Sequence, residues 1–402
     1  MKKSLLALAA MGAFAGAAQA QSSVTVYGIL DVGYTGGNAR VSTPAGGTAK
    51  ETVNRISNSM ESGSRLGFRG NEDLGGGTSA QFVFELGINP AGDNMSNTWS
   101  PNIRQGFAGL TQKGLGSVRI GTQNSLYWEQ GNNMTGQLAQ TAGSMLAPSV
   151  VGANFIQSNN DNGSFSPAYT VRTPNTINIR TERMAGVVLK ASYTMSDSNR
   201  NQVNVAAPNQ GYVGGTTNQN GYQVAFDWVI QKANIQASYA SFKAENPYNY
   251  TPAQANNGGL GATIGAPSAW GVTGGSNVTD NQALITASYD FGILKAFVGW
   301  TDRKVTSAVN SNAYLKRTAQ EIGVRGYATK TIEYWASVGN GRWTSFGTSN
   351  PTANITGYQV GSNYWMSKRT NLYAIFGANN TSTTTVGSSG LNQYSLGVRH
   401  TF

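Results

Sequence analysis

Apolar and polar residues alternate along most of this chain. From residue 24 onward, short segments follow a period of two, and connections rich in Gly, Asn and Ser separate them. One such segment places Tyr222, Val224 and Phe226 on one face. Gln223 and Asp227 fall on the opposite face. This alternation predicts half-buried β-strands, so we expect an all-β fold.

The start of the chain indicates export. Within residues 1–20, two lysines precede an apolar run over residues 5–18. Small residues at Ala18 and Ala20 then predict cleavage of a secretory signal peptide after Ala20. A transmembrane anchor is the alternative, but the run is shorter than the roughly 18–20 apolar residues that span a bilayer. We expect residues 21–402 to form a single domain.

The composition of the exported part favours a membrane barrel. After Ala20, no other apolar stretch is long enough to be a membrane helix. Charged residues make up 11% of the chain, compared with about 25% in ordinary soluble domains. A soluble β-sandwich also alternates, but its polar face is normally rich in Lys and Glu, whereas here it carries Ser, Thr, Asn and Gly. In lipid, only helices and closed barrels satisfy all backbone polar groups.

The connections between the segments come in two sizes. Short ones lie at residues 72–77, 112–116 and 182–186. Long ones lie near residues 36–54, 89–101, 122–172, 197–220, 244–280, 304–316, 343–353 and 381–390. Short periplasmic turns and long external loops are typical of outer-membrane barrels, and the segments number about sixteen, a size that leaves an aqueous channel. We therefore expect a 16-stranded antiparallel transmembrane β-barrel.

Several classes of function are disfavoured. The chain has no cysteine, so disulfide and thiol chemistry are excluded. Its formal charge is +10, but the basic residues are scattered rather than clustered, so no nucleic-acid partner is expected. His400 is the only histidine and no metal-ligand spacing is present, so we expect neither an enzyme nor a cofactor or metal site.

Strand alternation also predicts which charges point into the barrel. A charge on the lipid face near mid-membrane costs roughly 2–4 kcal/mol. Leu66 and Phe68 are expected to face lipid, which directs Arg65 and Arg69 inward.

The same argument extends to other strands. If Ile103 and Phe107 face outward, Arg104 faces inward. The remaining basic residues that this argument places inside are Arg119, Arg180, Lys190, Arg325 and Arg399. The tryptophans mostly lie near strand ends, as expected for an interfacial aromatic girdle.

Four stretches of the sequence carry a family resemblance. They are SVTVYGILD at residues 23–31, SRLGFRGNEDLGGG at 64–77, SKRTNLY at 367–373 and GVRHTF at 397–402. Together they resemble the general diffusion porins of Gram-negative outer membranes, particularly the β-proteobacterial type. The resemblance spans the whole exported chain. It implies a homotrimer in the outer membrane in contact with lipid and lipopolysaccharide. It also implies a third external loop folded into the pore, and an assembly signal at Phe402 for the barrel-assembly machinery.

The resemblance further implies a pore constriction, because porins of this type set arginines of the wall against acids of the inward loop. The inward loop is expected at residues 122–172. The expected basic side is Arg65, Arg69, Arg104, Arg119, Arg180 and Lys190, and the acidic side is Glu129, Asp161, Glu85 and Asp31. The alternative is that the arginines only solvate the lumen and pair with Asp31, Glu85 and one another. The sequence Gly121-Thr122-Gln123 departs from the family, which often has an arginine there.

The predicted function is passive diffusion of ions and small hydrophilic solutes, with a modest preference for anions. The preference is expected to be modest because charges in a hydrated pore are screened beyond about 8–10 Å. A substrate-specific porin for sugars or organic anions is the nearest alternative. A surface adhesin or receptor barrel is a further one.

Overall fold

The computed structural model describes residues 23–42, 47–58, 60–90, 102–135, 172–200, 215–245, 278–308, 311–346, 352–384 and 387–402. These residues form seventeen β-strands and one helix, α2 (Leu126–Thr135). No helix in this described part is long and apolar enough to cross a membrane.

The first nine strands in chain order are β1 (Ser23–Ser42), β2 (Thr48–Asn58), β3 (Arg65–Gly75), β4 (Thr78–Gly87), β5 (Asn102–Gln112), β6 (Gly116–Asn124), β7 (Arg172–Thr181), β8 (Val187–Arg200) and β9 (Gly215–Ile230). The remaining eight are β10 (Ala233–Glu245), β11 (Val278–Asp290), β12 (Leu294–Ser307), β13 (Tyr314–Tyr327), β14 (Ile332–Phe346), β15 (Thr352–Trp365), β16 (Thr370–Thr383) and β17 (Gly387–Thr401).

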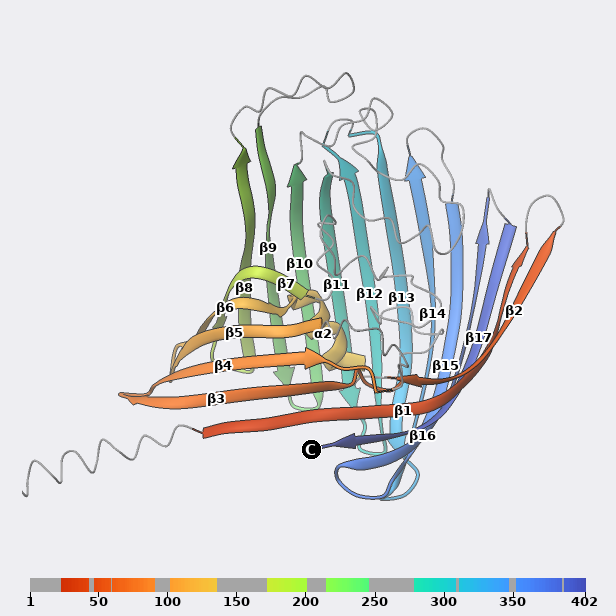
Figure 1. Ribbon diagram of the computed structural model, residues 1–402, viewed down its shortest axis with the longest axis horizontal. Helices are drawn as coiled ribbons and strands as arrows, with labels where there is room; N and C mark the ends of the chain where they lie inside the picture. The colour runs from red at the N-terminus through yellow and green to blue at the C-terminus, as the bar shows by residue number, and fades with distance from the viewer. Residues whose placement is uncertain are drawn as a thin grey trace, which may run out of the picture.

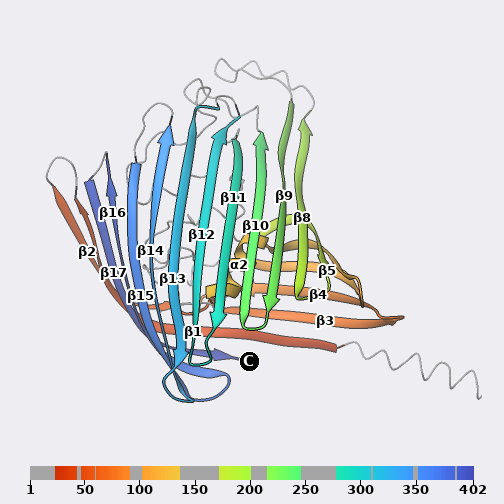
Figure 2. The same cartoon turned by 180° about the vertical axis from the view of Figure 1, so that it is seen from behind.

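The strands close into a barrel. Each strand from β3 to β17 pairs antiparallel with the next, and β1 pairs with both β17 and β3. These strands form a closed ring of sixteen, as the sequence predicted. The strand β2 is additional: it pairs with Val32–Ser42 of β1, while β3 pairs with Ser23–Ile29 on the same edge. In Figures 1 and 2, β9–β14 stand side by side and β3–β6 cross beneath them at a steep angle.

The two ends of the barrel differ. Turns of two to five residues join β3 to β4, β5 to β6, β7 to β8, β9 to β10, β11 to β12, β13 to β14 and β15 to β16. Both ends of the described chain lie beside these short turns, because Gly28 and Phe402 exchange backbone hydrogen bonds of 3.1 and 3.2 Å. The other ends of the strands, such as Arg200 of β8 beside Gly215 of β9, lie at the opposite end of the barrel. This is the asymmetry expected of a barrel with its short turns in the periplasm.

Several predicted loops are shorter than expected, because the strands continue into them. Most of residues 36–54 forms the β1–β2 hairpin, and most of 304–316, 343–353 and 381–390 is strand. These segments are rich in Ser, Thr and Asn and do not alternate clearly, so they resemble loops in the sequence. Their backbones nevertheless extend the ladder, as in the pairing of Val41 with Ser389. A strand with solvent on both faces needs no apolar face, so its sequence need not alternate between apolar and polar residues.

A bulge corrects one prediction of alternation. In the pairing of β4 with β5, Glu85 lies opposite Gln105 and Leu86 lies opposite Ile103, so Arg104 is an extra residue. The extra residue shifts the alternation, so that Ile103 is exposed but Phe107 is buried inside the barrel. The outward assignment of Phe107 is therefore wrong. Arg104 still points inward, because its Nε donates a hydrogen bond to the buried Glu85 at 2.7 Å.

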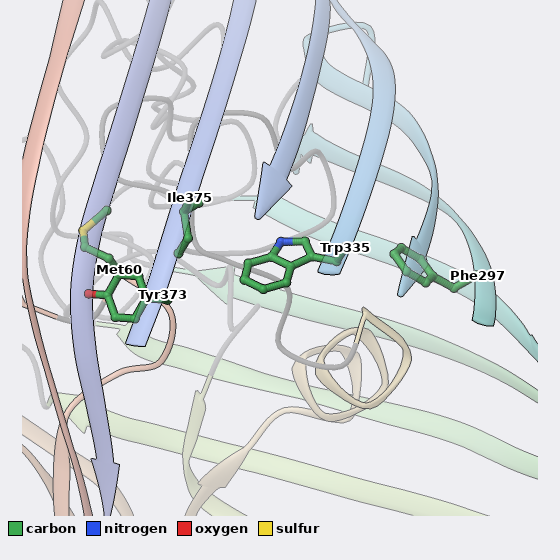
Figure 3. Packing of buried hydrophobic residues seen from close by; sticks show 5 residues of the cluster. All are labelled: Met60, Phe297, Trp335, Tyr373 and Ile375. Atoms are coloured by element: carbon green, nitrogen blue, oxygen red, sulfur yellow. The ribbon is translucent and has the colours of Figure 1, made fainter. Parts of the chain in front are cut away.

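A short segment between β2 and β3, Met60–Ser64, folds into the barrel. Met60 is fully buried and forms a cluster with Phe297, Trp335, Tyr373 and Ile375 (Figure 3). Trp335 is thus an interior residue, unlike the interfacial tryptophan that the sequence predicted. The carboxylate of Asp31 accepts backbone hydrogen bonds from Glu61 (2.8 Å) and Ser62 (2.6 Å). The Tyr373 hydroxyl donates to the same carboxylate at 2.7 Å.

We expect Met60→Ala to destabilise the barrel. Removing a fully buried methionine side chain leaves a cavity and costs roughly 2–5 kcal/mol. The free energy of unfolding in urea, measured on the protein folded into lipid vesicles, tests this. Met366→Ala is the control, because Met366 is exposed at a short turn and should change stability by less than about 0.5 kcal/mol. Equal losses in the two variants would show that Met60 does not anchor the segment.

Candidate pore constriction

The helix α2 begins the third external connection and starts with a capped end. Ser125 precedes it, and the Ser125 hydroxyl accepts a hydrogen bond from the backbone N–H of Trp128 at 3.0 Å. A serine in this position satisfies one of the free N–H groups at a helix start. Glu129 lies in the first turn, where the helix dipole favours a negative charge. The local sequence therefore explains why a helix forms here.

Contacts with the inner wall hold α2 inside the barrel. The Gln223 side chain accepts a hydrogen bond from the Leu126 backbone N–H at 2.9 Å, and Tyr127 shares one of 2.8 Å with Thr301. Tyr127 also packs against Leu284, and both side chains are buried. The backbone of α2 lies closest to β9–β12, and the helix lies in the barrel interior in both views (Figures 1 and 2). The start of the predicted constriction loop is therefore folded inward. Residues 136–171, including Asp161, lie outside the described part.

Glu129 joins α2 to the facing wall. Its two carboxylate oxygens accept a bidentate pair from Arg180 of β7, at 2.7 and 2.6 Å. Lys190 of β8 donates to the same carboxylate at 2.8 Å. Burial alone would raise the pKa of Glu129. The charges of Arg180 and Lys190 and their hydrogen bonds outweigh burial and hold this pKa at about 2. The neighbouring Arg119 stacks over the Phe107 ring at 5.2 Å.

A second acid, Glu85 of β4, pairs with arginines from neighbouring strands. The Arg104 Nε donates to it at 2.7 Å, Arg65 approaches to 3.9 Å, and the Tyr27 hydroxyl donates at 3.1 Å. Arg65 is oriented in turn by the inward segment, because its Nε donates to the Gly63 carbonyl at 2.8 Å. Glu85 was expected on the acidic side facing the arginines, but it lies among them on the same wall.

Arg172 is a wall residue that sequence analysis missed. It was placed at the end of the long loop, yet it begins β7 and pairs with Asn124 of β6. Arg104, Glu85 and Arg65 all act electrostatically on its guanidinium. Gly121 pairs with Thr176 of β7 and has a φ of +135°, and the register shifts just after it. Arg172 thus lies opposite Asn124, at the end of the Gly121-Thr122-Gln123 segment, which has no charge of its own.

Together these groups give one wall an excess of positive charge. We call this set the basic wall: Arg65, Arg104, Arg119, Arg172, Arg180 and Lys190, from β3 and β5–β8. With Glu85 and Glu129 as the two acids bound to it, the formal charge is 6 − 2 = +4. The side chains of Arg65, Arg104 and Arg180 are 16–17% exposed, so solutes in the lumen can reach them.

Elsewhere on the inner face, the described cations are mostly paired one to one with acids. Arg303 binds Asp280 at 2.8 Å, and Arg325 binds Glu333. Arg399 approaches Glu61 to 3.9 Å, and two asparagine side chains also donate to that carboxylate. Burial raises the pKa of Glu61 above its usual range, against the opposing effects of these donors and of Arg399. The net charge of the described lumen is thus concentrated on the basic wall.

Three predicted site residues lie apart from this arrangement. Arg69 is exposed and stacks over the Tyr27 ring at 5.3 Å, nearer to the short turns than Arg65. Asp31 is fully buried and holds the segment Met60–Ser64 rather than facing the basic wall. Phe402 ends the closing strand against Gly28, and its assembly role remains a prediction.

We expect the Glu129 bridge to persist in acid. A depressed pKa means that the bridge is fully formed above the ordinary pKa of 4.5 and is lost only as the pH falls through about 2. Glu129→Gln, which raises the charge of the wall, should therefore strengthen anion preference equally at pH 7 and pH 4. The measurement is the difference in reversal potential between the variant and the unmodified protein. A difference that halves near pH 4.5 would contradict the low pKa.

The fold and this site define a class of protein. A closed sixteen-stranded barrel with a polar, charged interior and an inward helix is an outer-membrane channel of the porin class. The chain belongs to the Gram-negative porin family, whose model matches residues 7–384. This confirms the family resemblance, and it places the protein in the outer membrane.

Individual relatives agree with this assignment. An outer membrane porin protein of Bordetella pertussis is 27% identical over the full length of both chains. The outer membrane porin protein 32 of Delftia acidovorans is 42% identical over about a third of each chain, 30% of this one and 31% of the relative. Among solved structures, the anion-selective porin from Comamonas acidovorans covers 95% of this chain and all of its own, with a TM-score of 0.64 at 19% identity. OmpT of Vibrio cholerae, solved in a trimer form, covers 95% of this chain and 99% of its own, with a TM-score of 0.58 at 12% identity.

Proposed function

We propose that this porin is a passive, water-filled channel that prefers anions, and that its selectivity arises between α2 and the basic wall. The observation that carries the proposal is the excess charge of +4 on one side of the lumen, beside a helix that narrows the passage. The structural neighbour named as an anion-selective porin supports the same sign of selectivity.

The geometry suits permeation rather than tight binding. Selective conduction needs fixed charges that attract an ion and yet release it. Glu85 and Glu129 neutralise part of the charge of the wall and hold Arg104 and Arg180 in defined orientations. Anions would therefore meet a row of oriented but partly neutralised cations. Screening over about 8–10 Å at physiological salt keeps the preference modest.

We propose a homotrimer, supported by the trimer form of the OmpT neighbour. We further propose a signal peptide over residues 1–20, a single domain over residues 21–402 and an assembly signal at Phe402. We propose no catalytic role.

Planar-bilayer recording of the refolded protein tests the proposal. Conductance steps in groups of three, with a reversal potential toward chloride under a KCl gradient, are the expected result. A reversal potential toward potassium would overturn the anion preference but leave the channel. Block by a micromolar sugar or organic anion would favour a substrate-specific porin, and the absence of conductance from a folded barrel would overturn the channel itself.

A further inference from the structure

The segment Met60–Ser64 interrupts the barrel wall between β2 and β3. These two strands pair with the same edge of β1 (Figure 1), and only Leu30 and Asp31 of β1 separate the two pairings. The chain between β2 and β3 is longer than these two residues require, and the excess folds into the barrel. Extra residues in one strand of a pair redirect side chains and are frequent beside functional sites.

Hydrogen bonds fix this segment on two sides. At the wall, the Ser64 hydroxyl accepts a hydrogen bond from the Asp31 backbone N–H at 3.0 Å. Inside the barrel, the Glu61 carboxylate accepts one from the side chain of Asn363 and one from that of Asn371, both at 2.8 Å. The segment therefore spans from β1 to β15 and β16, and its backbone has a defined place in the lumen.

Between these anchors, Ser62 and Gly63 contact two guanidinium groups of the basic wall. Arg65 donates from Nε to the Gly63 carbonyl at 2.8 Å and from Nη2 to the Ser62 hydroxyl at 3.2 Å. Arg104 lies against the same glycine. A Cβ at position 63 would meet the Nη1 of Arg104 at 3.0 Å, and its Cζ and Nη2 at 3.5 and 3.6 Å. A larger residue at this position would therefore move the Arg104 guanidinium.

The two arginines need such contacts because their charges repel each other. Both approach the single carboxylate of Glu85, Arg104 to 2.7 Å and Arg65 to 3.9 Å, so one acid serves two cations. Carbonyl and hydroxyl oxygens carry only partial negative charge, so they orient a guanidinium group without cancelling its formal charge. The segment thus holds the arginines in place and leaves their charge to attract a passing anion.

We propose that Ser62 and Gly63 are positioning residues of the anion pathway, which act through Arg65 and Arg104. The Ser62 hydroxyl and the Gly63 carbonyl hold the Arg65 guanidinium. The absence of a side chain at Gly63 gives the Arg104 guanidinium its place beside Glu85. The anion preference then depends on where these charges are held as well as on their number. This inference rests on the proposed anion preference of the channel.

Gly63→Val tests the assignment, because it changes no charge and keeps the carbonyl that Arg65 uses. Its methyl groups extend into the space that the Arg104 guanidinium fills. The reversal potential under a KCl gradient should move toward zero by about half of the shift that Arg104→Gln causes, since the charge stays in the lumen but is no longer held in place. Gly106→Val is the matched control. Gly106 shares the outward face of β5 with Leu110, and the atom nearest to its Cβ position is 3.6 Å away, so the reversal potential should not change.

Double variants separate positioning from a general disturbance of the barrel. In the Arg104→Gln background, Gly63→Val should cause no further shift, because residues that act through one contact are not additive. Ser62→Ala should cause a smaller shift, which is absent in the Arg65→Gln background. Conductance steps show that each variant is folded, and Gly63→Ala provides the same comparison with a smaller side chain if Gly63→Val forms no channels.

The outcomes distinguish this inference from the proposed function. A potassium preference in the unmodified protein would overturn the anion channel itself. A chloride preference that neither Gly63→Val nor Ser62→Ala alters would overturn the positioning role. The same conclusion would follow if Gly63→Val shifted the reversal potential equally with and without the Arg104 guanidinium.

Discussion

Replacing Arg65, Arg104 and Arg172 together by glutamine is expected to remove most of the anion preference. The formal charge of the basic wall falls from +4 to +1, because the three arginines around Glu85 are neutralised while that carboxylate remains. Glutamine keeps a hydrogen-bond donor beside Glu85. The reversal potential under a KCl gradient should therefore move most of the way to zero, with a much smaller change in total conductance.

A control of equal charge separates a local effect from a global one. Lys232→Gln, Lys330→Gln and Lys368→Gln also remove three positive charges, from exposed short turns outside the lumen. Since Coulomb effects are screened beyond about 8–10 Å, this control should retain the original reversal potential. Equal shifts in the two triple variants would assign selectivity to the overall charge of the protein. No shift in either would place the selective element outside the basic wall.

The barrel itself could be predicted because its determinants are local. Lipid on one side and water on the other impose a period of two on every spanning strand, and the sequence records that period directly. The same period correctly directed Arg65, Arg119, Arg180 and Lys190 inward. The exposed Ile120 and Ile179 of the structure show the outward partners that this alternation requires.

The arrangement of the site could not be predicted, because it depends on register and on departures from the period. The bulge at Arg104 reverses the alternation after it, and only the pairing of β4 with β5 reveals this. Arg172 belongs to the wall because β7 begins earlier than its loop-like sequence suggests. The inward turn at Met60 has no local signal, since Met60 clusters with residues more than 200 positions away in the sequence.

The second large effect is expected from Tyr127→Ala. Tyr127 is buried, packs against Leu284 and shares a hydrogen bond with Thr301. Truncating a buried aromatic residue costs about 3–5 kcal/mol. The hydrogen bonds of Leu126 and Gln130 with β9 and the Glu129 bridge remain, but they do not replace the lost packing against Leu284. We expect α2 to leave the inner face of β9–β12, which raises single-channel conductance and increases current noise.

The conservative variant Tyr127→Phe distinguishes packing from hydrogen bonding. It keeps the ring against Leu284 and loses only one hydrogen bond, worth about 1 kcal/mol, so its conductance should stay near that of the unmodified protein. Swelling of liposomes in sugars of increasing size provides an independent measure, because a displaced α2 should admit larger sugars. If Tyr127→Ala changed neither conductance nor the size limit, α2 would not form the narrow part of the pore. The charge of the basic wall would then act in a passage whose width is determined elsewhere, and the anion preference would survive without a constriction at this helix.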